Sequence, residues 1–145
     1  MKVVLTRRLP AAATARLDGI AELVQLEDGH AALVAGVAAA DALVSLITDR
    51  IDAEVIGAGA ALKVIANVGV GFNNIDVAAA RAHGIVVTNT PDVLSAATAD
   101  LTWALILGIT RRIGEGERLV RKGAWPGWAF DQLLGMELEI GRAHV

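Results

Sequence analysis

The stretch that decides the fold runs from residue 62 to residue 76 and reads LKVIANVGVGFNNID. An apolar run over 63–67 is followed by Gly69 and Gly71 and then by the Ala-rich residues 75–82. An apolar run, a glycine turn and a helical segment in this order predict a strand that turns tightly into a helix. In open parallel sheets such turns lie at the carboxyl edge, where ligands bind. The stretch therefore indicates both a fold class and a place for a site.

The same alternation is repeated on both sides of this stretch. The expected strands cover 3–5, 23–26, 42–46, 63–67 and 85–88, and the expected helices cover 10–18, 29–38, 51–58 and 75–82. The strand segments do not alternate clearly between apolar and polar residues, which is typical of strands covered on both faces. Repeated strand–helix units predict an α/β fold with a parallel five-stranded sheet.

The pattern changes after residue 88. Residues 90–92, Thr-Pro-Asp, offer an N-cap and a helix-start proline, and the chain to about residue 122 predicts one long helix or two joined helices. Residues 96–109 are apolar on nearly all sides, so we expect them to pack against a second domain or a second subunit. Two glycines, at 114 and 116, weaken the second half. Residues 123–135 are expected to form a docking loop or an interface element.

Composition and charge narrow the function classes. The formal net charge is −3 with both signs scattered, so we expect no nucleic-acid partner. The chain has no cysteine, which excludes disulfides and thiolate chemistry, and its three histidines lie too far apart in sequence to predict a metal site. The N-terminus lacks a signal-peptide core and the apolar run 101–109 is too short to span a bilayer. The expectation is a cytoplasmic protein without a membrane partner.

The two glycines of the deciding stretch do not make a dinucleotide-binding fingerprint. Asn74 stands where the third glycine is needed, and Asp92 follows a helix-start proline and not a second strand. The simpler explanation is a tight turn in which the glycines supply positive φ. Such a turn also leaves the N–H groups of Val70 and Gly71 open to a small anion, and a helix starting near Asn74 would add its positive end. A carboxylate fits this turn.

Three ordered stretches, 44–52, 62–76 and 84–105, resemble the D-isomer-specific 2-hydroxyacid dehydrogenases, in particular their glyoxylate/hydroxypyruvate reductase branch. The resemblance extends to Leu138 and implies a flavodoxin-like substrate domain over 1–94. A crossover helix over 95–122 and the beginning of a cofactor domain over 123–138 would follow. The resemblance further implies NAD or NADP as cofactor, a small 2-keto or 2-hydroxy acid as substrate, and a homodimer when intact.

The resemblance also implies roles for single residues. The amides of Val70 and Gly71 would hold the substrate carboxylate, Ile47 and Thr48 would line the substrate pocket, and Thr98 would face the nicotinamide. For Ile47 the simpler alternative is packing in the core, and for Thr98 it is a hydroxyl that bonds back to its own helix.

The residues that carry out the chemistry in this family are an Arg, a His and a Glu, with a G-x-G-x-x-G cofactor loop, and all are expected beyond the end of this chain. No catalytic residue is therefore assigned, and the chain alone is expected to be inactive. His30 and His83 are expected to be solvated surface residues. A small flavodoxin-like binding or regulatory module, or a dimerisation unit, remains the alternative.

Residues 139–145 are expected to be a non-native tail. Ile140–Val145 reads IGRAHV, which matches the translation of a widely used sequencing adapter in one frame. A natural truncation, in which Gly141 and Arg142 echo the family's cofactor loop, is the alternative.

Overall fold

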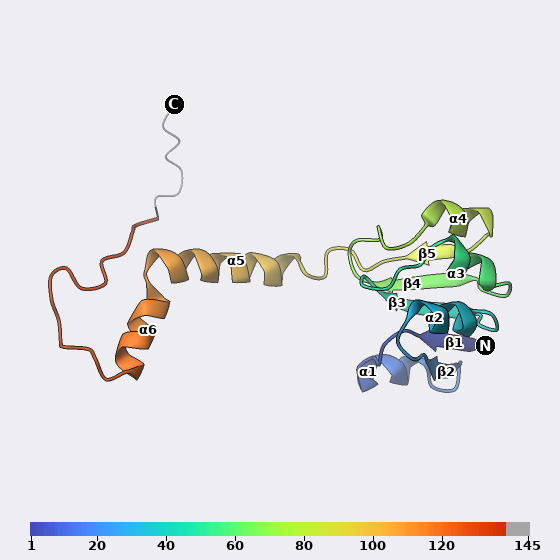
Figure 1. Cartoon of the computed structure of the whole chain (residues 1–145), viewed down its shortest axis with the longest axis horizontal. Coiled ribbons are helices and arrows are strands. Elements are labelled where there is room, and N and C mark those ends of the chain that lie inside the picture. Colours follow the sequence, from blue (N-terminus) through green and yellow to red (C-terminus); the bar gives the residue numbers. More distant parts are fainter. Residues whose placement is uncertain (139–145) are drawn as a thin grey trace, which may run out of the picture. The chain divides into compact units, whose positions relative to one another are not determined.

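The structure is a computed structural model that describes residues 1–138 and divides into two compact units, Met1–Val93 and a second one from Leu94 onward. The first unit is an α/β domain (Figure 1). Its elements follow in the order β1 (Lys2–Leu5), α1 (Ala11–Thr14), the 3-10 turn η1 (Ala15–Leu17), β2 (Glu22–Gln25), α2 (His30–Val37), β3 (Ala42–Leu46), α3 (Ala53–Ala58), β4 (Val64–Val68), α4 (Val77–Ala82) and β5 (Val86–Thr88).

The five strands form one parallel sheet in the order β2-β1-β3-β4-β5. This confirms the predicted fold class, and each predicted strand ends within one residue of the observed strand. The register places Leu43 of β3 between Val4 of β1 and Ile65 of β4. Because β2 and β3 lie on opposite sides of β1, the strand order reverses between β1 and β3. Open α/β sheets bind ligands at the carboxyl ends of strands at such a point.

The main core lies between the sheet and helices α2, α3 and α4. Leu43 and Ile65 from the sheet are fully buried there against Val37 of α2 and Ile56 of α3. Burying an aliphatic side chain of this size contributes roughly 1.5–3 kcal/mol, so this layer holds the domain together. Helices α3 and α4 begin at aspartates: the Asp52 carboxylate accepts from the Val55 N–H, and Asp76 caps α4 in the same way.

The opposite face of the sheet is covered only in part. A small cluster of Val3, Leu5 and Ala42 packs there with Leu9 and Ala21, which flank the short α1–η1 segment. Further along this sheet Val86 of β5 is 59% exposed. The prediction that all strands are covered on both faces is therefore wrong. One helix is about 10 Å wide and covers about two strands spaced about 4.8 Å apart, so α1–η1 cannot shield five.

The second unit holds two helices, α5 (Ser95–Thr110) and α6 (Ile113–Arg121). The break falls at residues 111–112, where Arg112 takes the left-handed conformation (φ 53°), and not at the two glycines, which lie inside α6. The predicted helix start at 90–92 is also wrong, since α5 begins at Ser95. The stretch from 123 to 138 contains neither helix nor strand, and its Met136 N–H donates to the Thr110 carbonyl (2.9 Å).

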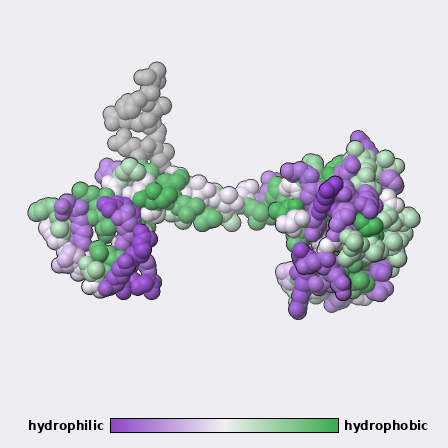
Figure 2. Space-filling model, in the orientation of Figure 1, coloured by the Kyte–Doolittle hydropathy of each residue, from purple (hydrophilic) through white to green (hydrophobic). Residues whose placement is uncertain are grey.

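Helix α5 buries little within its own unit. Leu101 is 60% exposed and Ile109 73%, whereas Thr110 is the one buried residue of the helix. Apolar surface therefore runs along this unit (Figure 2). The burial expected for 96–109 is not provided by the described residues. Among residues 1–138, no helix is both long and apolar enough to cross a membrane.

The predicted tail, with His144, lies outside the described residues.

Candidate functional site

The turn 69–71 after β4 is held by its carbonyl groups. The first carbonyl accepts from the Thr90 N–H (2.9 Å), the second from the Asn89 side-chain amide (2.8 Å) and the third from the Asn67 side-chain amide (2.8 Å). All three acceptors of the turn are thus used by residues of the same domain. The position of the turn is therefore fixed by hydrogen bonds to its carbonyl groups.

The N–H groups of Val70 and Gly71, unlike the carbonyl groups of the turn, have no hydrogen-bond partner among residues 1–138. Within the part of the chain that the structure describes, neither N–H donates to a main-chain or side-chain acceptor. Both residues are exposed, Val70 to 45%. Two unpaired N–H groups on exposed residues of a fixed turn suit a small anion such as a carboxylate, which accepts several hydrogen bonds.

A pair of asparagines, the buried Asn67 and the half-buried Asn74, connects this turn to the loop after β3. The side-chain amides of Asn67 and Asn74 donate to each other's oxygen (3.3 Å each), and Asn67 is only 2% exposed. Asn74 also donates to the carbonyls of Leu46 (3.1 Å) and Asp49 (3.0 Å), while the Ser45 hydroxyl donates to Asn67 (3.0 Å). Because buried amides need partners, this network fixes both loops at once. Sequence analysis missed it, although a polar Asn67 inside an apolar run was a usable signal.

Gly69 is required by close packing and not by its backbone angle. Neither Gly69 nor Gly71 has a positive φ, so the prediction that these glycines supply one is wrong. A Cβ atom on Gly69 would collide with Cγ2 of Ile47. Ile47 itself is 59% exposed, which rules out simple core packing for this residue. Ile47 therefore lies against the turn and presents an apolar surface beside it.

The helix expected near Asn74 begins later than predicted. α4 starts at Val77, and the carboxylate of Asp76 already accepts from the Ala79 N–H (2.9 Å) at that end. The helix has only six residues. The predicted contribution of a positive helix end to the turn 69–71 is therefore wrong, and the anion site depends on the two N–H groups.

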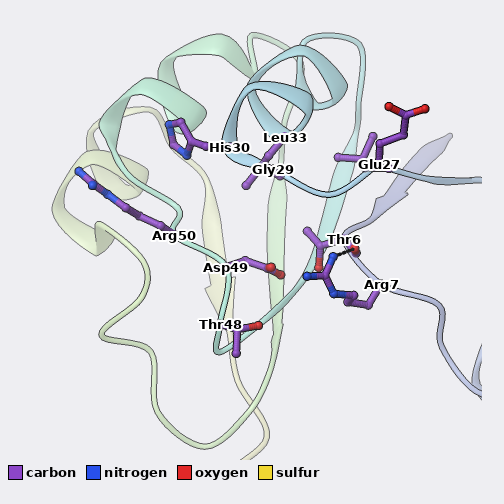
Figure 3. Close-up of a pocket in the computed structure, with 10 residues that line it drawn as sticks. Thr6, Arg7, Glu27, Gly29, His30, Leu33, Thr48, Asp49 and Arg50 are labelled. Carbon is purple, nitrogen blue, oxygen red and sulfur yellow. Dashed lines mark hydrogen bonds between the residues drawn. The ribbon is translucent and has the colours of Figure 1, made fainter.

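A cavity of about 300 Å³ lies where the strand order reverses, at the carboxyl ends of β1, β2 and β3 (Figure 3). Thr48 lines it together with Thr6 and Arg7 from the end of β1. Thr6 is only 6% exposed, yet its hydroxyl has no hydrogen-bond partner anywhere in residues 1–138. Asp49 also lines the cavity, and its carboxylate is fixed by the Leu46 N–H (2.7 Å). Thr48 thus lines this cavity, and its predicted contact with substrate stays a prediction.

Two further predicted residues lie apart from this edge. Thr98 is exposed in the first turns of α5, where its carbonyl accepts from the Thr102 hydroxyl (2.8 Å). Its own hydroxyl makes no hydrogen bond to any described residue, so the alternative in which it bonds back to its helix is not observed. His83 is exposed at the end of α4, as predicted, with Nδ1 2.9 Å from the Ala79 carbonyl oxygen.

Fold and site together define a parallel α/β domain with an anion-accepting turn and a polar cavity at the carboxyl edge of its sheet. Residues 3–133 match the sequence profile of the "D-isomer specific 2-hydroxyacid dehydrogenase, catalytic domain". The chain belongs to this family of dehydrogenases.

Individual relatives agree with this assignment. A glyoxylate reductase of Thermococcus onnurineus is 43% identical over 96% of this chain and 43% of its own length. The crystal structure of TT0316 protein from Thermus thermophilus superposes with a TM-score of 0.85 at 44% identity, covering 96% of this chain and 46% of that one. An NADPH-dependent glyoxylate/hydroxypyruvate reductase from Sinorhizobium meliloti, solved with NADP and malonate, gives 0.71 at 33% identity, covering 86% and 39%. The chain spans less than half the length of these relatives.

Proposed function

We propose that this chain is the substrate-binding part of an oxidoreductase that transfers hydride between NAD(P)H and a small 2-keto or 2-hydroxy acid, such as glyoxylate or hydroxypyruvate. The observation that carries the proposal is the turn 69–71, whose carbonyls all accept hydrogen bonds and whose Val70 and Gly71 N–H groups have no partner among the described residues. The similarity to glyoxylate reductases supports the same reaction class. A structural relative holds malonate, a small dicarboxylate, together with NADP.

The residues have distinct roles in this proposal. Val70 and Gly71 donate their N–H groups to the substrate carboxylate and so fix the orientation of the acid. Ile47 packs beside the turn and limits the space next to the bound acid, while Thr48 forms the wall towards the cavity. These contacts would position the carbonyl group of the substrate but would not polarise it or supply a proton.

The nicotinamide cofactor, NAD or NADP, supplies the hydride when bound. Within the described residues Thr98 fits this assignment, because its exposed hydroxyl is free to donate or accept. We assign residues 1–94 to the substrate domain, 95–122 to a crossover segment and 123–138 to the start of the cofactor domain. The Arg, His and Glu of the family chemistry are expected outside this chain, so the chain alone should not reduce glyoxylate.

A second candidate function is dimerisation. The observation in its favour is α5, whose side chains Leu101, Leu105 and Ile109 are each more than half exposed. Apolar surface of this kind is typical of an interface. In this proposal the intact protein is a homodimer, and sedimentation of the chain over a range of concentrations would detect association.

The experiment that tests the carboxylate site is an amide NMR titration of the 145-residue chain with glyoxylate. The signals of Val70 and Gly71 should shift saturably, whereas glycolaldehyde, which lacks the carboxylate, should leave them in place. A Gly71→Val variant should weaken the response because its side chain covers the N–H groups. Gly57→Val is the matched control, since Gly57 lies on α3 with open space around it. Equal shifts with the neutral compound, or in both variants, would refute the site.

A further inference from the structure

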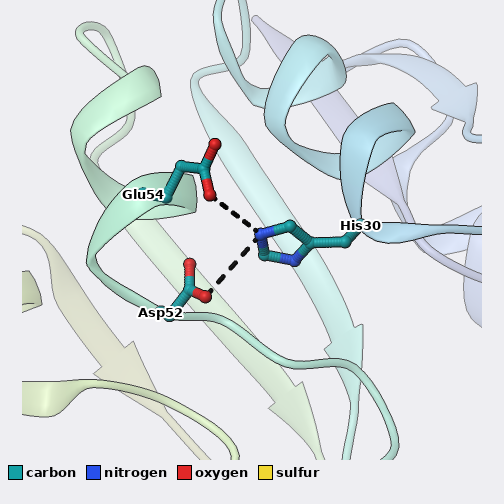
Figure 4. Close-up of side chains that lie close together, drawn as sticks. All are labelled: His30, Asp52 and Glu54. Carbon is teal, nitrogen blue, oxygen red and sulfur yellow. Dashed lines mark hydrogen bonds and ion pairs between the residues drawn. The ribbon is translucent and has the colours of Figure 1, made fainter.

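A cluster of one histidine and two carboxylates connects the beginnings of α2 and α3. His30 is the first residue of α2, Asp52 is the N-cap of α3 and Glu54 lies in its first turn. The imidazole points towards both carboxylates (Figure 4), with Nε2 3.4 Å from Glu54 Oε2 and 3.6 Å from Asp52 Oδ2. The sequence did not predict a metal site because its histidines lie far apart, whereas the groups close to His30 are carboxylates.

The separations match those of a zinc coordination shell. Zinc binds nitrogen and carboxylate oxygen at about 2.0–2.2 Å in a tetrahedron, which places neighbouring ligand atoms about 3.3–3.6 Å apart. The two separations from His30 Nε2, 3.4 and 3.6 Å, fall within this range, and all three ligand atoms lie within 4.8 Å of one another. The side chain of Glu54 is 70% exposed, so it is free to close the remaining gap by rotation.

We propose that His30, Asp52 and Glu54 form a binding site for a divalent transition metal, with zinc as the best fit. One imidazole and two carboxylates are a donor set that zinc accepts, and three protein ligands leave its fourth position to water. His30 also lines the cavity at the carboxyl ends of β1, β2 and β3, so the cluster lies beside that cavity. The metal would cross-link α2 and α3.

One neighbouring group opposes the metal. The guanidinium of Arg50 lies 3.1 Å from the same Asp52 oxygen, and the positive ends of both helices also disfavour a cation. Two carboxylates face one guanidinium, so we expect Arg50 to weaken metal binding without abolishing it. The competition predicts that removing Arg50, which is 82% exposed, strengthens metal binding.

The test is a calorimetric zinc titration of the 145-residue chain over about 1 μM to 1 mM. His30→Ala should weaken the binding at least about tenfold, because even outer-sphere changes cost about ten- to a hundredfold. Glu54→Gln should weaken it as well, and Asp52→Asn tests the third ligand while keeping an oxygen for the helix cap. Arg50→Ala should tighten binding about two- to fivefold. The matched control is His83→Ala, which removes an exposed histidine elsewhere and should leave the affinity unchanged.

Two outcomes would overturn the proposal. Equal zinc affinity in the unmodified chain and in His30→Ala would show that the metal binds elsewhere. Absence of saturable binding up to about 1 mM would show that His30 only pairs with its two carboxylates. Arg50→Ala separates loss of a ligand from loss of the fold, because a misfolded protein would not bind zinc more tightly. Glu54→Gln changes an exposed side chain and should leave the fold intact.

Discussion

The side-chain amides of Asn67 and Asn74 exchange two hydrogen bonds of 3.3 Å, and Asn74 also donates to the carbonyls of Leu46 and Asp49, which ties the loop after β4 to the loop after β3. The two residues are seven positions apart, and both loops contribute residues to the proposed acid site. Replacing either asparagine should therefore affect the whole edge of the sheet.

Asn74→Ala removes donors to the carbonyls of Leu46 and Asp49 and leaves Asn67 short of partners. The free energy of unfolding should fall by about 1–3 kcal/mol, the cost of leaving buried polar groups unpaired. Urea unfolding followed by circular dichroism measures this, because all tryptophans lie in the second unit and fluorescence would miss the domain. Asn73→Ala, at the exposed neighbouring position, should change stability by less than about 0.5 kcal/mol. A similar loss in both variants would contradict the network.

Gly69→Ala introduces a Cβ that collides with Cγ2 of Ile47 and should destabilise the domain by about 1–3 kcal/mol. Ile47→Ala removes the colliding atom, so the double variant should recover most of the loss. The coupling free energy from the four urea curves is the readout. Additive effects would mean that Gly69 is needed for a reason unrelated to Ile47.

Thr6→Val replaces the buried hydroxyl that lacks a partner among the described residues by a methyl group of the same shape. Stability should stay the same or rise by up to about 1 kcal/mol, since no hydrogen bond is lost and a desolvated polar atom is removed. Ser45→Ala is the contrasting variant, because its hydroxyl donates to Asn67 (3.0 Å) and its loss should cost about 1–2 kcal/mol. A large loss in Thr6→Val would reveal a partner for that hydroxyl.

Asp41 should make stability depend on pH in the acid range. The Lys2 main-chain N–H (2.8 Å) and the Lys63 ammonium (3.1 Å) hold the pKa of the Asp41 carboxyl below its ordinary value. A pKa lowered on folding stabilises the native state above the unfolded pKa of about 3.9, and this contribution is lost as the pH falls through the lower folded value.

The difference in unfolding free energy between the unmodified chain and Asp41→Asn should therefore shrink as the pH is lowered from 6 to about 3. Urea curves at both pH values measure this difference. Lys63→Met keeps the aliphatic stem and should remove only part of the pH dependence, because the Lys2 N–H remains. A constant difference across this range would mean that Asp41 titrates normally.

The strands could be predicted from sequence because each is a short, mainly apolar run, and the parallel sheet followed from the alternation of these runs with helical segments. The contacts of the site could not, since they join residues far apart in the chain. Ile47 meets Gly69 only because β3 and β4 are neighbours in register, and His30 meets Glu54 across 24 positions. Residues 90–92 look like a helix start, but α5 begins at Ser95, and the Thr90 N–H donates to the Gly69 carbonyl across 21 positions of the chain.

The bonds from Asn89 and Thr90 have a mechanical consequence. The connector that leaves β5 is fastened to the two peptides that would grip an acid, so it cannot flex at 89–90 without disturbing them. We therefore expect the connector to bend in the residues after Thr90, where Asp92 adopts a left-handed backbone conformation (φ 65°). Movement of the connector and binding of an acid at the turn 69–71 are thus coupled, so each should affect the other.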